Sequence, residues 1–225
     1  MTQFQSARFS IFTMAVMMFS ALTIGWGINE LQTLPEHPAR ATFLVLLSIQ
    51  FLMAGIFAPM SSLNINQQDY YRISKLVTIL GAVGSTLFLF VSAFSDSHEW
   101  MRLFGSDMVR YLGLLSFMMG SILSTWATVH VSRKFGEHTT VHTNHYLITD
   151  GPFRYIRHPR CFGGILMFVG VPLIFLSSLG LLLALISAVG LLERIGRQEK
   201  ILQQAFKEEW QNYAQRTRCF IPWVY

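Results

Sequence analysis

Hydrophobic residues come in long blocks along this chain, and most charged residues lie between the blocks. Four apolar blocks run roughly over residues 9–28, 41–60, 75–94 and 111–131. A fifth stretch, from Cys161 to Leu192, carries no charged residue over its 32 positions. Each of the first four blocks has about the 20 residues that a helix needs to cross a bilayer. The pattern therefore predicts four membrane-spanning helices followed by a longer apolar segment.

The uncharged stretch is too long for one straight crossing. At a rise of 1.5 Å per residue it would extend for about 48 Å, against a hydrocarbon core of about 30 Å. Ser177, Ser178 and Gly180 lie at its middle, where small and polar residues favour a tight turn. We therefore expect a helical hairpin over residues 161–192.

The pattern changes again after the hairpin. Apolar residues now recur at steps of seven, four, four and three, which is the spacing of one face of a helix. These residues are Ile195, Leu202, Phe206, Trp210 and Tyr213. We expect an amphipathic helix over residues 193–216 that lies outside the membrane.

Composition supports the same fold class. Hydrophobic residues make up 52% of the chain and charged residues 13%, whereas about 25% of an ordinary soluble domain is charged. So few charges cannot cover the surface of a water-soluble protein of 25.7 kDa. The sequence predicts an all-α integral membrane protein with about six apolar helical segments, four spans plus the C-terminal hairpin.

The basic residues are distributed unevenly between the two sides of the predicted membrane. The hairpin places 14 of the 17 lysines and arginines on the side that holds the N-terminus, and three on the opposite side. Because basic residues prefer cytoplasmic loops, we expect a multi-pass protein with both termini in the cytoplasm. The net charge of +5 follows from this topology and does not indicate a nucleic-acid partner.

A basic cluster comes directly before the hairpin. Arg154, Arg157 and His158 are three and four residues apart, so on one helical turn they would share a face. Such a cluster suits a carboxylate, a phosphate or a lipid headgroup, and Gly163 and Gly164 would let a ligand or a neighbouring backbone approach. Alternatively, the arginines only reach lipid phosphates and fix the topology.

One carboxylate lies on the apolar stripe of the amphipathic helix. Glu199 follows Ile195 by four residues and precedes Leu202 by three. A buried carboxylate costs several kcal/mol unless a partner compensates it, so a partner should be near. The candidates are Arg154, Arg157, the pair Arg194 and Arg197, or the hydroxyls of a ligand. A structural salt bridge and a ligand contact both stay open.

The two polar segments together resemble the isoprenylcysteine carboxyl methyltransferase family, within the wider group of membrane phospholipid methyltransferases. The shared motifs lie between about residues 145 and 222: GPFRYIRHP and a following glycine, an apolar hairpin, RI with QE and L, FxEEWxxY, and a final IP. The resemblance implies an S-adenosylmethionine-dependent methyltransferase with a cytoplasm-facing cofactor pocket. A lipid-like or small acceptor, for example the carboxylate of an isoprenylated cysteine, would enter from the bilayer. Residues 1–132 would then be N-terminal transmembrane helices and 133–225 the methyltransferase-like catalytic region.

The resemblance also assigns residues. Arg157, His158 and Pro159 match the arginine-histidine-proline triplet of the family, Gly163 matches the glycine that follows, and Glu199 matches the second of a usual pair of glutamates. Catalytic roles are expected for Arg157, which would hold an ionised carboxylate acceptor, and His158, which would be the base for a thiol or amine. Cofactor binding is expected at His158, Pro159, Gly163, Glu199 and Arg154.

Two positions depart from the family pattern. Cys161 stands where the family commonly has a tyrosine, and Gln198 stands where it has the first glutamate. The identity of the acceptor therefore stays open. So do two other functions: an NADPH-dependent enzyme like the membrane sterol reductases, since arginines also suit nicotinamide phosphates, and a non-enzymatic protein that binds anionic lipids.

A histidine cluster precedes the basic segment. His138, His142 and His145 are four and three residues apart, a spacing that could place them on one helical face. The threonines and asparagine between them indicate a polar loop instead. We therefore expect no metal ion, and the sequence leaves the oligomeric state open.

Overall fold

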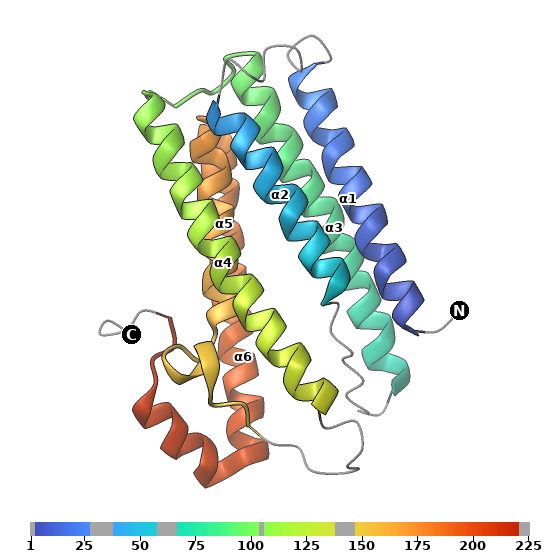
Figure 1. The fold of residues 1–225 in the computed structure, drawn as a ribbon, viewed down its shortest axis with the longest axis vertical. Helices are drawn as coiled ribbons and strands as arrows, with labels where there is room; N and C mark the ends of the chain where they lie inside the picture. The colour runs from blue at the N-terminus through green and yellow to red at the C-terminus, as the bar shows by residue number, and fades with distance from the viewer. Residues whose placement is uncertain (1–2, 28–37, 58–66, 104–105, 138–146, 221–225) are drawn as a thin grey trace.

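The computed structural model is a bundle of long helices that stand side by side (Figure 1). It describes residues 3–27, 38–57, 67–103, 106–137 and 147–220. In chain order the elements are α1 (Gln3–Trp26), α2 (Pro38–Ile56), α3 (Gln67–Ser97), α4 (Asp107–Glu137), the 3₁₀ turn η3 (Gly151–Arg154), α5 (Pro159–Ile174) and α6 (Ser178–Arg216). The predicted all-α fold is thus confirmed for the described part of the chain.

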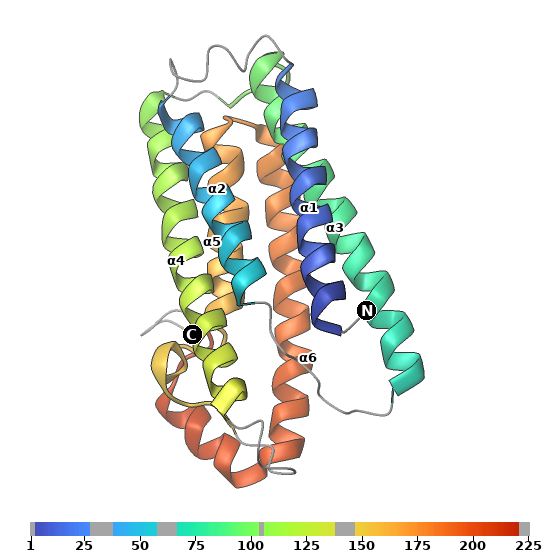
Figure 2. The same ribbon diagram turned by 45° about the vertical axis from the view of Figure 1, so that its right-hand side comes forward.

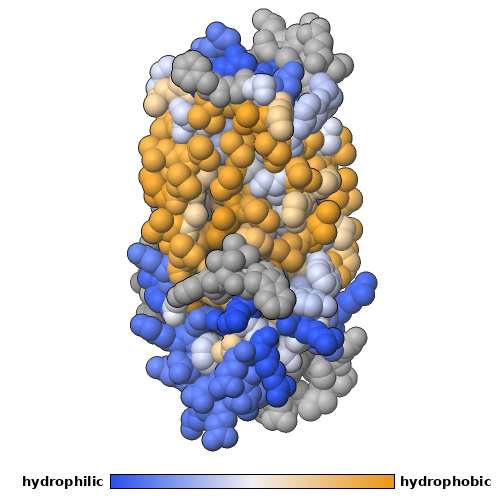
Figure 3. Space-filling model, turned by 90° about the vertical axis from the view of Figure 1, so that its left-hand side faces the viewer, coloured by the Kyte–Doolittle hydropathy of each residue, from blue (hydrophilic) through white to orange (hydrophobic). Residues whose placement is uncertain are grey.

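The surface of the bundle is that of a membrane protein. Of the described helices, α2, α4 and α6 are long and apolar enough to cross a bilayer, and α1, α3 and α5 contain shorter apolar stretches. On the face that Figure 3 shows, a hydrophobic belt crosses the middle of the molecule and the ends are more hydrophilic. Large apolar side chains such as Phe12 and Ile122 are more than half exposed. Lipid would cover this belt, because water would make such exposure costly.

The predicted helical hairpin is confirmed. Helices α5 and α6 run antiparallel beside each other (Figure 2), and only residues 175–177 separate them. Ser177 caps α6, where its hydroxyl accepts a hydrogen bond from the Gly180 amide at 3.0 Å. The turn is buried because the connection between α3 and α4 closes over it: the Ser178 amide donates to the Met101 carbonyl at 3.0 Å.

The amphipathic helix is not a separate element. It continues the second arm of the hairpin, since α6 runs from Ser178 to Arg216. Leu192, Glu193 and Arg194 follow one another across the predicted boundary at 192/193, and such residues favour an unbroken helix. The break comes later, at Lys207, whose φ of 43° and ψ of −111° turn the last part of α6 aside (Figure 1).

Glycines bring α4 and α5 into very close contact. A Cβ atom on Gly170 would lie 2.7 Å from the Gly113 carbonyl oxygen, and one on Gly163 would lie 2.6 Å from the Gly120 carbonyl oxygen. Such small-residue contacts are typical of helix packing in membranes. They fix the position of α5 against α4. The expected division of the chain between residues 132 and 133 falls inside α4 and stays a prediction.

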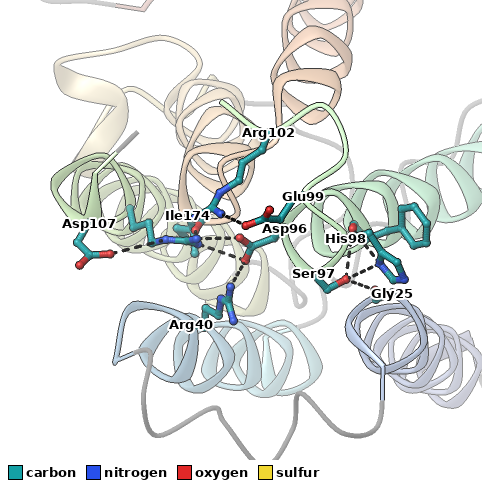
Figure 4. A network of polar contacts seen from close by, with 11 residues as sticks. Gly25, Arg40, Asp96, Ser97, His98, Glu99, Arg102, Asp107 and Ile174 are labelled. Atoms are coloured by element: carbon teal, nitrogen blue, oxygen red, sulfur yellow. Dashed lines mark hydrogen bonds and ion pairs between the residues drawn. The ribbon is translucent and has the colours of Figure 1, made fainter. Parts of the chain in front are cut away.

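A buried ion network joins four helices at the end of the bundle that holds the hairpin turn (Figure 4). Asp96 of α3 accepts from Arg40 Nη2 at 2.7 Å and from Arg110 Nη2 at 2.8 Å. Arg110 Nη1 also donates to the carbonyl of Ile174, the last residue of α5, at 2.6 Å. The sequence placed both arginines on one side of the membrane but did not pair them with Asp96.

Candidate active site

The segment between η3 and α5 is held in place by the C-terminal part of the chain. The amide of Arg157 donates to the carbonyl of Arg218 at 2.8 Å, and Ile156 forms an isolated parallel bridge with the same residue. The expected single helical turn through Arg154, Arg157 and His158 is therefore not formed. Pro159 explains this, because a residue before proline avoids the helical region, and His158 has φ −125° and ψ 57°.

Three of the predicted site residues meet in one cluster. Arg157 Nε donates to Glu199 Oε1 at 2.7 Å, and His158 Nε2 lies 3.3 Å from the same oxygen. Arg157 Nη1 also donates to the carbonyls of Thr217 at 2.7 Å and Ala214 at 3.1 Å. The partner that the stripe position of Glu199 requires is thus Arg157, one of the candidates, supported by His158.

Burial keeps His158 neutral at pH 7. Burial lowers its pKa below the ordinary value of 6.5, and Arg157 lowers it further, while Glu199 acts in the opposite direction. Only 5% of the His158 side chain is exposed. A neutral imidazole can accept a proton, so His158 has the protonation state of a base.

Cys219 lies beside the same cluster. Its Sγ atom, a ring nitrogen of His158 and a carboxylate oxygen of Glu199 all lie within 4.8 Å of one another. Burial raises the pKa of the Cys219 thiol to about 11, and the charge of Glu199 adds to this. A protonated thiol and the nearby Arg157 both disfavour a cation, so the absence of a metal ion stays our prediction. The histidines at 138, 142 and 145 lie outside the described residues.

A cavity of about 530 Å³ opens between the end of α4, the segment before α5, α5 itself and α6. Arg157, His158 and Pro159 line it from the segment before and at the start of α5. From α6 it is lined by Leu191, Arg194, Gln198, Leu202, Phe206, Trp210 and Tyr213. The break at Lys207 turns the last of these residues toward η3, where Tyr213 Oη donates to the Phe153 carbonyl at 2.7 Å.

The other predicted residues lie near the cavity but not in its wall. Glu199 lies behind Arg157 and His158 and holds them there, with 23% of its side chain exposed. Gly163 faces α4, as the close approach of Gly120 requires. Arg154 is exposed at the end of η3 and is not among the residues that line the cavity.

Several residues that line the cavity are not among the predicted site residues. Phe206, Trp210 and Tyr213 belong to the predicted apolar stripe, whose spacing indicates only the buried face of a helix. Arg160 and Arg194 also line the cavity. Arg160 precedes Gly164 by four residues, and Arg194 follows Leu191 by three. Residues at these spacings share a helix face, so the spacing is the sequence signal that places each arginine on the cavity side of its helix.

Comparisons with known proteins show which protein family the sequence of this chain resembles. Residues 108–209 match the family described as phospholipid methyltransferase. The matched segment begins in α4, so the similarity extends further toward the N-terminus than the motifs predicted. Because α4 packs on α5 and lines the cavity through Val131, it is part of the same structural unit.

Individual relatives have more specific names. Two rice proteins, from Oryza sativa subsp. indica and subsp. japonica, are each named "Probable protein-S-isoprenylcysteine O-methyltransferase" and are 31% identical over 121 residues. That alignment covers 52% of this chain and 62% of each relative, so the chain spans less than two thirds of their length. Protein-S-isoprenylcysteine O-methyltransferase B of Arabidopsis thaliana is 26% identical over 168 residues, 73% of this chain and 79% of the relative. The resemblance inferred from the sequence motifs is confirmed.

Proposed function

We propose that this protein is an integral membrane methyltransferase that uses S-adenosylmethionine and acts on a lipid-like acceptor. The carboxylate of an isoprenylated cysteine is the first candidate for the acceptor. The observation that carries the proposal is the meeting of Arg157, His158 and Glu199 beside a cavity of about 530 Å³ next to the apolar part of the bundle. The names of the relatives support it.

The residues around the cavity fit the cofactor. Its volume lies within the range of about 300–1,000 Å³ that is usual for ligand pockets. Phe206, Trp210 and Tyr213 offer aromatic faces for an adenine ring or a sulfonium cation. Gln198 and Arg157 add hydrogen-bonding groups for the polar ends of the molecule. The bound cofactor would supply an electrophilic methyl group.

The chain contributes mainly positioning. A well-oriented pair of reactants in a dry site gains about 7–11 kcal/mol relative to reaction in solution. Arg157 is fixed by one carboxylate and two carbonyl groups, so its guanidinium is held in one orientation. An ionised carboxylate acceptor needs no base. For a thiol or amine acceptor, the neutral His158 would take the proton.

Thermal-shift titration of the detergent-purified protein tests the proposal. S-adenosylmethionine and its demethylated product should each stabilise the protein, by about 2.7 kcal/mol at 100 times the dissociation constant. Reduced nicotinamide adenine dinucleotide phosphate should not. Stabilisation by the nicotinamide alone would indicate a reductase, and stabilisation by neither cofactor would indicate a lipid-binding protein without this activity.

A further inference from the structure

Helices α5 and α6 face each other and line the end of the cavity that lies nearer the membrane. On α5, Arg160, Gly164 and Phe168 line it at steps of four residues. On α6, Leu191 and Arg194 line it three residues apart. Because the two helices are antiparallel, Phe168 and Leu191 lie toward the middle of the bundle, and both arginines lie toward its polar end. The slot between them is apolar at one end and cationic at the other.

Two arginines at the cationic end, Arg160 and Arg194, have no ion-pair partner in the described part of the chain. Both are exposed at the rim. Both act electrostatically on the thiol of Cys161, which also lines the cavity. The first turn of α5 adds the positive end of a helix dipole. An anion between the two guanidinium groups would remove their mutual repulsion.

Gly164 leaves open space in the wall of this slot. A Cβ atom there would meet no other atom within 4 Å, whereas one on the neighbouring Gly163 would lie 2.6 Å from the Gly120 carbonyl oxygen. Helix packing therefore requires Gly163 but not Gly164. Cys161, three residues earlier, also lines the cavity with a small side chain. Neither Gly164 nor Cys161 fills the space beside the arginines.

We propose that Arg160 and Gly164 are specificity-determining residues of an acceptor subsite for an anionic amphiphile. The carboxylate or phosphate of this molecule lies between Arg160 and Arg194. It does not lie on Arg157, whose guanidinium is already bound by Glu199, Ala214 and Thr217. Its apolar body lies over Gly164, against Phe168 and Leu191. The proposal rests on the proposed methyltransferase function. It assigns the slot between α5 and α6 to the acceptor, and the aromatic end of the cavity, lined by Phe206, Trp210 and Tyr213, to the cofactor.

Binding measurements on the full-length protein in lipid nanodiscs test the subsite without relying on turnover. The probes are N-acetyl-S-farnesylcysteine, its neutral carboxamide, and farnesyl phosphate. Arg160→Gln should weaken binding of the carboxylate and phosphate probes by about threefold to tenfold and leave the carboxamide unchanged, as expected for one partly exposed ionic contact. Arg197→Gln removes the same charge from an exposed position of α6 outside the cavity and serves as control.

The second variant tests the apolar part of the slot. Gly164→Leu should weaken all three probes by at least about tenfold, because its side chain fills the space that the apolar body needs. Gly190→Leu is its control, since Gly190 is exposed on α6 and also has open space around it. Equal losses for charged and neutral probes in Arg160→Gln, or unchanged binding in Gly164→Leu, would overturn the assignment.

Binding of the demethylated cofactor to the same samples separates this proposal from the proposed function. Both variants should bind S-adenosylhomocysteine as the unmodified protein does. If no sample binds S-adenosylhomocysteine, the methyltransferase function fails. The probe results then still decide whether Arg160 and Gly164 select an anionic amphiphile.

Discussion

Glu199 shows how far single residues could be interpreted from the sequence. Its place on an apolar stripe required a partner, and Arg157 was among the candidates. The stripe could not indicate that the carboxylate lies behind the cavity wall, because that depends on how the segment before α5 folds across α6. The same holds for Arg160 and Gly164, whose proposed role depends on the face that α5 turns toward α6.

Glu199→Gln should weaken binding of S-adenosylhomocysteine by about tenfold. The change keeps the size of the side chain but removes the charge that fixes Arg157 and attracts His158, and hydrogen bonds to charged groups contribute about 1.5–3 kcal/mol. Isothermal titration calorimetry on folded protein measures the effect. Glu208→Gln, at an exposed position of α6, should change the affinity little. Equal affinity in all three proteins, with only the melting temperature lowered, would reduce Glu199 to a structural residue.

His158 should make the protein sensitive to mild acid. Its pKa is below 6.5 in the folded protein, so between these two values the unfolded chain binds a proton that the folded protein does not. Stability should therefore be constant above about pH 7 and fall as the pH drops below about 6.5. Thermal unfolding between pH 8 and 5 should show this slope, and His158→Asn should flatten it.

His98→Asn serves as the control for this prediction. His98 is an exposed histidine in the connection after α3, and its replacement should leave the slope of stability against pH unchanged. Asp150 does not interfere, because its hydrogen bonds to His130 and Lys134 lower its pKa to about 2. Its contribution to stability is nearly complete above about pH 5 and is lost as the pH falls toward 2. A slope that persists in His158→Asn would contradict the assignment.

At the scale of helices, length and charge predicted the hairpin, but nothing in the sequence marked the break inside α6. Lys207 occupies φ 43° and ψ −111°, a region where glycine is the usual residue. A lysine in a run of helix-forming residues predicts an uninterrupted helix. The break matters for the site, since it brings Tyr213 against η3 and closes the aromatic end of the cavity.

Lys207→Gly should stabilise the protein by about 1 kcal/mol, because it removes the backbone strain of a side chain at positive φ. Lys200→Gly places the same change in a regular, exposed turn of α6 and should destabilise by about 1 kcal/mol. Melting temperatures of the two variants in the same detergent compare them directly. If both variants lose stability equally, Lys207 is not strained.

At the scale of the whole molecule, the ion network around Asp96 could not be predicted. Asp96, Arg40 and Arg110 lie on three helices, and their pairing depends on which helix ends adjoin. Asp96→Asn should lower stability by about 3–5 kcal/mol, since it leaves two buried guanidinium groups without their shared carboxylate. Asp107→Asn, whose carboxylate is 86% exposed and 4.0 Å from Arg110, should have little effect. Equal melting temperatures in these two variants would contradict a stabilising role.

The membrane orientation decides whether the site could bind S-adenosylmethionine from the cytoplasm, as the proposed function requires. The Asp96 network and the candidate site lie at opposite ends of the bundle (Figure 1), and the uneven distribution of basic residues predicts that the site faces the cytoplasm. Single cysteines can be introduced into a Cys161→Ser, Cys219→Ser background at Ser106 and Asn212, which are both exposed and lie at the two ends.

A membrane-impermeant maleimide applied to intact cells should label Ser106→Cys at once and Asn212→Cys only after permeabilisation. Both variants should retain binding of S-adenosylhomocysteine, which shows that the background is folded. Labelling of Asn212→Cys in intact cells would invert the orientation. It would separate the cavity from the cytoplasmic cofactor pool and remove the physical basis of the proposed reaction.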